Sequence, residues 1–171
     1  MNYEIVEINE KIVIGISKVT TNKDGQAVND IGELWKKFMG KGIYNAIKGK
    51  KNDKTIGLYT DYQGDFTSPY SFVACCEVNS NSDKEKNLEE LNTNNTVGES
   101  IISKVIPAGK YAKFVIVGGQ KEVGDFWFKF WQMDFDRTYI SDFEEYQCNI
   151  LIQRNKKFII HRNKVDLLLL Y

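Results

Sequence analysis

Short hydrophobic runs separated by polar turns fill the first part of the chain, except for residues 29–39, which have a helical period. Residues 11–19 form a β-branched apolar run that ends in the polar stretch 20–25, which predicts a strand followed by a turn. From 29 to 39 the apolar residues recur every three or four positions, which predicts an amphipathic helix. Asn29 is the predicted N-cap of this helix and Gly40 its predicted end.

The polarity pattern next predicts a pair of strands and a polar connection. Residues 55–62 and 71–78 are apolar runs joined by a loop rich in Gly, Asp, Thr and Ser, which is typical of an antiparallel pair. Residues 79–99 are polar and show little periodicity, so we expect a surface connection with at most a short helical turn around Leu88 and Leu91. This connection marks a boundary between two halves of the chain.

After this boundary the order of elements begins again. Residues 101–106 and 111–117 are predicted strands that flank a Pro- and Gly-containing turn. A second helix is predicted from 122 to about 135, because its aromatic residues follow a helical spacing. Residues 142–146 and 164–170 are the predicted closing strands.

The repeated order predicts a duplicated unit. Trp35 and Trp131 occupy comparable places in the two predicted helices, and each helix follows a strand that ends in a polar or Gly-rich turn. We expect one α+β domain, residues 1–171, built from two strand-helix-strand-strand units, about 1–80 and about 100–171. The two units would form an antiparallel sheet with two helices, and a ligand is expected in the central cleft between them.

Composition narrows the classes of function. The chain has 23 Lys and Arg residues and 23 Asp and Glu residues, so its formal net charge is zero. Without a net positive charge, a nucleic acid is not expected as a direct partner. The first residues lack a signal-peptide pattern, which favours the cytoplasm, and the longest apolar run, 167–171, is too short for a membrane span. Cys75, Cys76 and Cys148 fit neither a disulfide framework nor a zinc site and are expected to be reduced and buried. His161 lacks a catalytic or metal-spaced partner, and no cofactor is expected.

The candidate chemistry centres on an acidic stretch near the C-terminus. On a strand, side chains alternate between faces, so Glu144 and Tyr146 would point the same way while Asp142 and Glu145 compete with Glu144 as acids. These acids could simply form a solvated edge. In an apolar cavity, however, burial raises the pKa of a carboxyl group until a cation arrives to pair with it. Asp166, in the last predicted strand, would face either the same cavity or solvent.

Aromatic residues are more numerous than one small core usually needs. Aromatic residues at helical spacing most often belong to the core, but a subset, with Trp131, Tyr62 and Tyr146 foremost, would line a pocket whose ring faces attract a cation. The full candidate set of ligand-binding residues is Glu144, Tyr146, Trp131, Trp127, Tyr62, Tyr59, Trp35, Phe72, Tyr111 and Asp166.

Five segments in order resemble a known family across nearly the whole chain. They are 3–6 with 13–16, 31–38, 57–62, 106–112 and 142–146, and together they resemble the effector-binding domain of bacterial transcription activators, also called the GyrI-like small-molecule-binding domain. The resemblance implies two fused units of the SHS2 type with a pocket at their junction, used by AraC- and MerR-type regulators to sense hydrophobic and often cationic compounds. It also implies that Glu144 is the pocket carboxylate. The chain shows no helix-turn-helix segment and is therefore expected to be a stand-alone member.

Three functions follow as hypotheses. The first is a cytoplasmic protein that binds a hydrophobic, cationic small molecule, with a separate regulatory protein as an open partner and multidrug binding as an expected property. The second is a hydrolase of reactive electrophilic compounds, in which Glu144 acts as general base and Tyr146 as hydrogen-bond donor. The third is a protein-interaction module of the gyrase-inhibitor kind, which predicts an exposed apolar patch.

Overall fold

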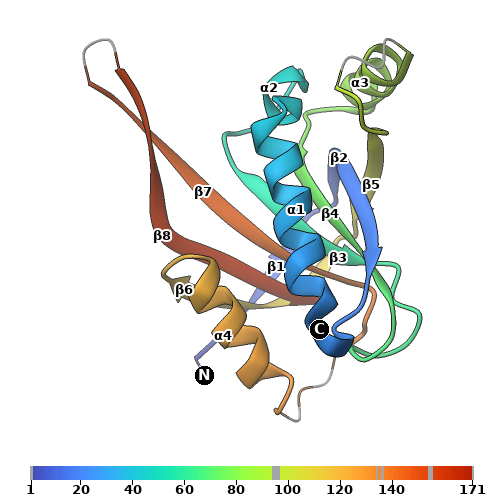
Figure 1. Cartoon of the computed structure of the whole chain (residues 1–171). Coiled ribbons are helices and arrows are strands. Elements are labelled where there is room, and N and C mark those ends of the chain that lie inside the picture. The colour runs from blue at the N-terminus through green and yellow to red at the C-terminus, as the bar shows by residue number, and fades with distance from the viewer. Residues whose placement is uncertain (1, 94–96, 134, 136, 154–155, 171) are drawn as a thin grey trace.

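Eight antiparallel strands and a few helices make up the computed structural model of the chain (Figure 1). It describes residues 2–93, 97–133, 135, 137–153 and 156–170, with the side chains of 120, 148–153, 156–165 and 170 left aside. The strands are β1 (Glu4–Ile8), β2 (Lys11–Thr20), β3 (Thr55–Thr60), β4 (Tyr70–Glu77), β5 (Ile102–Ile106), β6 (Gly109–Val117), β7 (Ser141–Gln153) and β8 (Lys156–Leu170). The helices are a 3-10 turn (Lys23–Gly25), α1 (Gln26–Gly40), α2 (Ile43–Ala46), α3 (Asn81–Thr93) and α4 (Gln120–Phe130). The predicted α+β class and antiparallel sheet are confirmed.

The strand order repeats about the centre of the sheet. The order is β1-β6-β8-β7-β3-β4-β2-β5. The strands of the unit β2-α1-β3-β4 and those of the unit β6-α4-β7-β8 therefore take equivalent positions on the two sides of the central β3–β7 pair. Each unit also receives an edge strand from the other half, since β1 pairs with β6 and β5 pairs with β2. This arrangement is the duplicated strand-helix-strand-strand order that the sequence predicts, while the bounds of the two repeats stay a prediction.

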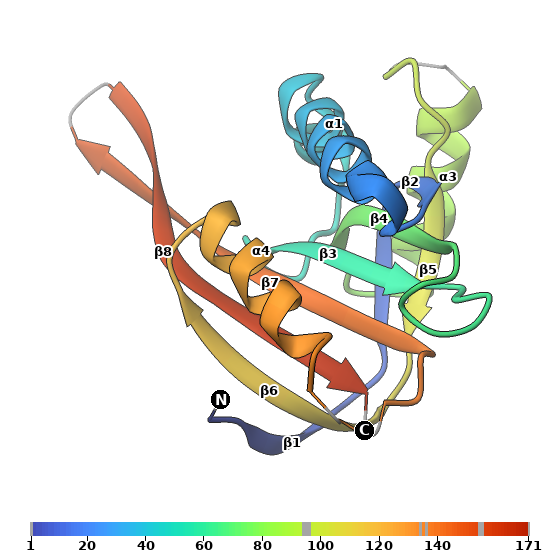
Figure 2. The same ribbon diagram turned by 60° about the horizontal axis from the view of Figure 1, so that its bottom comes forward.

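The sheet is curled and buries apolar side chains on both faces. Two residues join β1 to β2, and two join β5 to β6, although these strands lie at opposite ends of the strand order. Such short links span only about 10 Å, so the two ends of the sheet come together. Inside the curl lies a small core that includes Leu58, Tyr111 and Phe143. Figure 2 shows the curl, with helices α1 and α4 covering the other face.

Helices α1 and α4 form because their apolar residues fall on one side. Leu34 and Phe38 of α1 and Val123, Trp127 and Phe130 of α4 are buried in the larger core that these helices share with the sheet. The two helices lie beside one another on the same face of the sheet (Figures 1 and 2). Residues of both helices line a cavity above the central strands.

The bounds of both helices differ from the predicted ones. Helix α1 begins at Gln26 after Gly25, whose left-handed backbone makes the turn, so the prediction of Asn29 as N-cap is wrong; its end at Gly40 is confirmed. Helix α4 ends at Phe130 and not near 135. The helical pattern continued beyond the helix because the following loop also turns an aromatic ring, Phe135, toward Phe114 and Phe130.

Helix α3 is a full helix where the sequence predicted only a short turn. It spans 13 residues, yet among its buried residues the only apolar one is Leu91, so the hydrophobic period is nearly absent. Hydrogen bonds replace the missing pattern. The Ser80 hydroxyl accepts a hydrogen bond from the backbone N–H of Asp83. The buried side-chain amide of Asn87 accepts a hydrogen bond from the backbone N–H of Lys48 and donates one to the carbonyl of the same residue.

The closing strands are longer than predicted, and one edge strand was missed. Strands β7 and β8 continue as a hairpin through the stretch that the sequence left unassigned, and beyond Tyr146 they pair only with each other among the described strands. Strand β1 escaped the pattern because it is a short, largely exposed edge. Cys75 and Cys76 are buried free thiols, as predicted, whereas the predictions for Cys148 and His161 fall on side chains outside the described residues.

Across the residues that the structure describes, none of the helices has the length and apolar character needed to cross a membrane.

Candidate functional site

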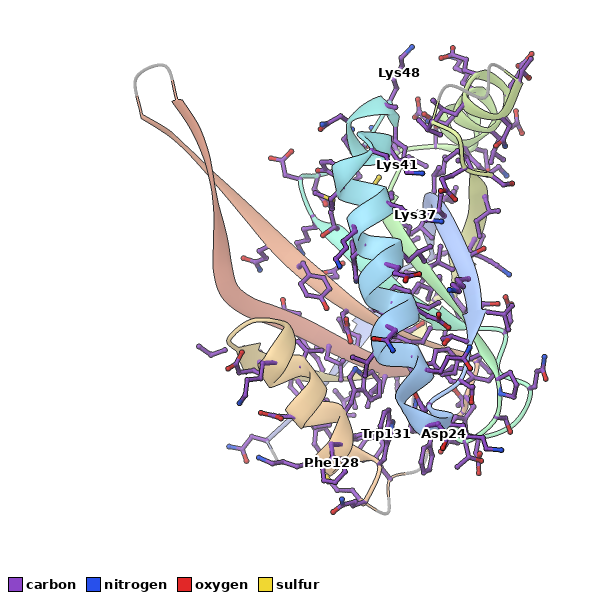
Figure 3. All side chains as sticks on the ribbon, viewed as in Figure 1. Asp24, Lys37, Lys41, Lys48, Phe128 and Trp131 are labelled. Atoms are coloured by element: carbon purple, nitrogen blue, oxygen red, sulfur yellow. The ribbon has the colours of Figure 1, made fainter. Side chains whose placement is uncertain are left out.

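A cavity of about 410 Å³ lies between α1 and α4 above the central strands. That volume falls in the range of small-molecule sites. Aromatic rings make up much of its wall: Trp35 comes from α1, Trp127 and Phe128 from α4, and Tyr59 from β3. Figure 3 shows Trp131 between α4 and the start of α1, with Phe128 nearby on α4. The cavity therefore sits at the junction of the two units.

Glu144 reaches this cavity because of its position on β7. The alternation of the strand sends Phe143 into the core inside the curl and Glu144 to the helix face, where the residue is 1% exposed. Its partner across the central β3–β7 pair is Gly57. A Cβ atom at Gly57 would lie 3.0 Å from the ring of Phe72 and 3.3 Å from Glu144 Oε2, so a glycine here leaves room for the carboxylate.

Three donors hold the carboxylate of Glu144. The hydroxyl of Tyr59 and the indole N–H of Trp127 donate to Oε1 over 2.8 and 2.7 Å, and the hydroxyl of Tyr146 donates to Oε2. Burial raises the pKa of Glu144 above its usual value, although these three bonds oppose that shift. No lysine or arginine among the described residues forms an ion pair with Glu144. Within the described part of the chain, this buried acid is therefore held by three neutral donors and by no cation.

Aromatic contacts fix the walls around this acid. The rings of Trp35 and Tyr146 meet edge to face with centroids 5.4 Å apart, and those of Tyr59 and Trp127 are 5.2 Å apart. Trp131 stacks on Phe66, with ring centroids 5.8 Å apart and planes only 8° from parallel. Such interlocked rings hold their faces in place before a ligand arrives.

A second charged group borders the cavity. Asp142 lies two residues before Glu144 on the same face of β7, forms an ion pair with the guanidinium of Arg137, and accepts a 2.8 Å bond from the Tyr62 hydroxyl. Burial lowers the pKa of Arg137, but the charge of Asp142, its hydrogen bond to the guanidinium and the nearby Tyr62 and Tyr139 together outweigh burial, so the pKa of the guanidinium lies above its usual value. Arg137 is part of the cavity wall. Asp142 and Arg137 therefore compensate each other's charge.

Seven of the ten predicted site residues line this cavity. They are Trp35, Tyr59, Tyr62, Trp127, Trp131, Glu144 and Tyr146. The shared face of Glu144 and Tyr146 is confirmed by their hydrogen bond. Trp35, Trp127 and Trp131 are all the tryptophans of the chain, so its indole fluorescence reports on this one site.

Three predicted residues lie elsewhere. Phe72 is on the correct face but is fully buried beneath the wall, where its ring supports Tyr59 with centroids 5.0 Å apart. Tyr111 points into the curl, packs on Phe143 and donates a 2.8 Å bond to the carbonyl of Pro107. Asp166 alternates with the cavity-side residue Leu167, so it also faces away from the cavity. The prediction that these three line the pocket is wrong.

Several wall residues were missed by sequence reasoning. Arg137 and Phe66 come from irregular segments without periodicity, so nothing in the local pattern assigns them a face. Gly57, which lies opposite Glu144 and is not part of the wall, had a readable signal: a glycine inside an apolar strand often marks a close approach of another group. Among the described residues, no group of three His, Cys, Asp or Glu side chains could hold a metal ion.

The whole-chain comparisons agree with this architecture. The family model of Cass2, integron-associated effector binding protein, matches residues 4–168. The chain belongs to this family. By description, members of this family are effector-binding proteins. Among curated proteins no significant match is found.

Solved structures share the fold of this Cass2 family member. The integron cassette protein VCH_CASS2 from the mobile metagenome of Vibrio cholerae is 26% identical, with a TM-score of 0.66 over 98% of this chain and 94% of that chain. SAV2435, solved bound to tetraphenylphosphonium, is 16% identical, with a TM-score of 0.63 over 99% and 93%. The C-terminal domain of EcmrR is 16% identical, with a TM-score of 0.55 over 99% and 97%.

Proposed function

We propose that this chain reversibly binds a hydrophobic organic cation in the cavity between α1 and α4, with Glu144 as the counter-charge. The observation that carries the proposal is a buried carboxylate, enclosed by aromatic rings, that no described lysine or arginine pairs with. Keeping such a charge out of water is costly, and an arriving cation recovers part of that cost. The ring faces of the wall add attraction for the same cation.

The hydrogen bonds of Glu144 favour a particular kind of cation. Tyr59, Trp127 and Tyr146 already occupy three of the roughly four acceptor positions that a carboxylate offers. A primary ammonium would need several of these positions, whereas a quaternary ammonium, pyridinium or phosphonium needs only the charge. We therefore expect permanently charged lipophilic cations to bind more tightly than primary amines of the same size. Tetraphenylphosphonium, the ligand of SAV2435, belongs to this class.

Two ions of the same shape and opposite charge test the proposal. Tetraphenylphosphonium and tetraphenylborate both carry four phenyl groups around one central atom, so they differ mainly in sign. Titration of the protein, followed by tryptophan fluorescence and by calorimetry, should give saturable binding of the phosphonium and at least about tenfold weaker binding of the borate. Equal binding of the two ions would contradict the role of Glu144 as counter-charge. Binding of neither would favour a protein-interaction module instead.

The hydrolase hypothesis makes a different prediction for the same site. If Glu144 activated a water molecule, electrophilic esters or epoxides incubated with the protein would be consumed. The Glu144→Gln variant would then no longer consume them but would still bind them with similar affinity. Under our proposal the ligand is recovered unchanged. Binding without reaction fits an effector-binding protein, which is how the family is described. Under our proposal the protein then sequesters its ligand or passes on the bound state to a separate regulatory protein.

A further inference from the structure

Arg137 occupies an arrangement that would itself serve as a cation site. Its guanidinium carbon lies 4.5 Å from the ring centroid of Tyr139, 5.5 Å from Phe130, 5.6 Å from Trp127 and 5.9 Å from Tyr62. Four rings within about 6 Å and a carboxylate, Asp142, are the features by which proteins bind organic cations. The cation in this second cage belongs to the chain itself.

This aromatic cage around Arg137 adjoins the ligand cavity through one side chain. The indole of Trp127 donates its N–H to Glu144, while Arg137 lies over the ring of the same indole. A ligand charge beside Glu144 is therefore about one aromatic ring away from the guanidinium. Both positions also share a strand, because Asp142 and Glu144 are two residues apart on the cavity face of β7.

The backbone near Arg137 indicates that the cage is held in place. Tyr139 has a φ of 52°, in the left-handed region that bulky residues rarely adopt. Its ring lies over Arg137 and also meets Tyr62 edge to face, with centroids 5.7 Å apart. A strained residue persists only where its surroundings fix it, and such residues cluster at binding sites. Among the described residues, the buried Nε–H of Arg137 has no hydrogen-bond partner. Packing and the charge of Asp142 therefore hold this side chain in place of a full set of hydrogen bonds.

We propose that Arg137 is the residue that restricts the cavity to ligands with one positive charge, because its guanidinium fills the second cage and repels a second cationic group. This inference rests on the proposed function and adds a rule of selectivity to it. With Arg137 present, the charges of Asp142 and Arg137 offset each other and Glu144 supplies the one attractive charge. Removal of Arg137 takes one positive charge from the wall and opens the space that it filled, so a dication gains a second favourable position.

A matched pair of planar ligands tests the rule. N-methylphenylpyridinium carries one charge, and methyl viologen has nearly the same shape with two. Calorimetric titration of the wild-type protein should give at least about tenfold tighter binding of the monocation. In Arg137→Gln this ratio should fall by about tenfold or more, while the monocation still binds. Arg137→Lys, which keeps the charge, should retain most of the wild-type preference.

A second comparison avoids leaving Asp142 without Arg137, which could impair folding. The Asp142→Asn variant is compared with the double variant that also carries Arg137→Gln. The second substitution removes the positive charge from a protein that no longer has a carboxylate at position 142, so it should again raise dication affinity relative to the monocation. Thermal unfolding checks that each variant is folded. An unchanged ratio in both comparisons, with monocation binding intact, would overturn the role of Arg137 and leave the proposed function standing. A wild-type protein that binds neither cation would instead refute the proposed function.

Discussion

Glu144 keeps its negative charge at a cost, and that cost makes ligand binding depend on pH. Because burial raises the pKa of Glu144, the folded protein holds a proton there at a pH where the unfolded chain has lost it. The pKa values of Tyr59 and Tyr146 are raised well above normal by burial and by Glu144, so both phenols stay protonated. Without ligand, the free energy of unfolding should therefore fall as the pH rises through the pKa of Glu144.

Cation affinity should change in the opposite sense. The charge of tetraphenylphosphonium does not titrate, so its affinity should rise with pH through the pKa of Glu144 and become constant above it. Calorimetric titrations from mildly acidic to neutral pH measure this change. In the Glu144→Gln variant, the affinity should stay constant over the same pH range. A flat profile in the wild-type protein would show that Glu144 is not the group that meets the cation.

Gly57 gives a second prediction at the scale of single residues. In Gly57→Ala the new methyl group would press on Phe72 and on Glu144 Oε2, at 3.0 and 3.3 Å. We expect a loss of about 1–3 kcal/mol in the free energy of unfolding and weaker phosphonium binding, because the carboxylate must move. Gly40→Ala, at the end of α1 where a Cβ meets open space, is the matched control and should lower neither stability nor binding, because alanine suits a helix better than glycine. Denaturant unfolding and fluorescence titration measure both effects.

Some of these residues could be predicted from the sequence and others could not. The two-residue period of a strand places Glu144 and Tyr146 on one face wherever the strand lies, so that pair followed from local geometry. Arg137 gave no such signal, since its position depends on an ion pair with Asp142 across an irregular loop. Tyr111 was misplaced because composition marks an aromatic residue without indicating on which face of a curled sheet it lies.

At the scale of elements, a polar cluster fixes helix α1 to the sheet. Asp30 of α1 forms an ion pair with Lys18 of β2 at 2.6 Å and accepts bonds from Thr20 at 2.7 Å and Gln26 at 3.0 Å. The hydrogen bonds from Lys18, Thr20 and Gln26 lower the pKa of Asp30 to about 2. Helix α1 forms one wall of the cavity, so this cluster positions Trp35.

The lowered pKa predicts the acid response of this attachment. A depressed carboxyl pKa contributes stability above the unfolded value, 3.8, and that contribution is lost as the pH falls through about 2. Asp30→Asn should therefore lower the free energy of unfolding at neutral pH and flatten its decline in acid. Urea unfolding at several pH values measures both. Glu33→Gln, at an exposed position 3.8 Å from Lys18, should leave the profile nearly unchanged; an equal effect would contradict the role of Asp30.

Helix α3 predicts a stability change without a change in binding. Ser80→Ala removes the side chain that caps the N–H of Asp83 and should cost about 1 kcal/mol of unfolding free energy. Ser82→Ala, at an exposed position in the same helix, is the control. Because α3 contributes no residue to the cavity wall, phosphonium affinity should be unaffected in both variants. A large loss of affinity in Ser80→Ala would show that α3 influences the site.

Helices were predictable in proportion to their amphipathicity. Helices α1 and α4 bury regular apolar stripes and were found from their period, whereas α3 relies on Asn87 and Ser80 and showed almost none. The Ser-x-x-Asp spacing at Ser80 and Asp83 was the available signal for its start. Polar contacts made across the fold, such as that of Asn87 with Lys48, leave no local pattern to read.

At the scale of the whole molecule, the site exists because two similar units meet. The central β3–β7 pair brings Gly57 opposite Glu144, and α1 and α4 supply equivalent walls from the two halves. The duplication was visible in the repeated order of elements. The prediction that Trp35 and Trp131 occupy comparable places in the two helices is wrong, because Trp35 lies within α1 whereas Trp131 follows the end of α4. The exchange of edge strands β1 and β5 was not visible, because β1 is short and largely exposed and because the pattern of β5 predicts a strand without indicating its pairing partner.

A ligand held between the two units should stabilise them together. Binding to the folded state alone raises the free energy of unfolding by about 2.7 kcal/mol at a ligand concentration 100 times the dissociation constant. Tetraphenylphosphonium should therefore raise the melting temperature in a concentration-dependent way, with α1 and α4 unfolding in one transition. Tetraphenylborate at the same concentrations serves as the control. An unchanged melting temperature with the phosphonium would contradict a site that bridges both units.

The most direct test of the central claim is the affinity of the Glu144→Gln variant for tetraphenylphosphonium. Glutamine has nearly the same shape, and its carbonyl oxygen can accept the bonds from Tyr59 and Trp127 while the Tyr146 hydroxyl turns to accept one from the amide. Only the charge is removed. We expect at least about tenfold weaker binding of the phosphonium by calorimetry, with affinity for neutral triphenylphosphine oxide retained. Equal affinity of the two proteins for the phosphonium would show that the buried carboxylate is not its counter-charge.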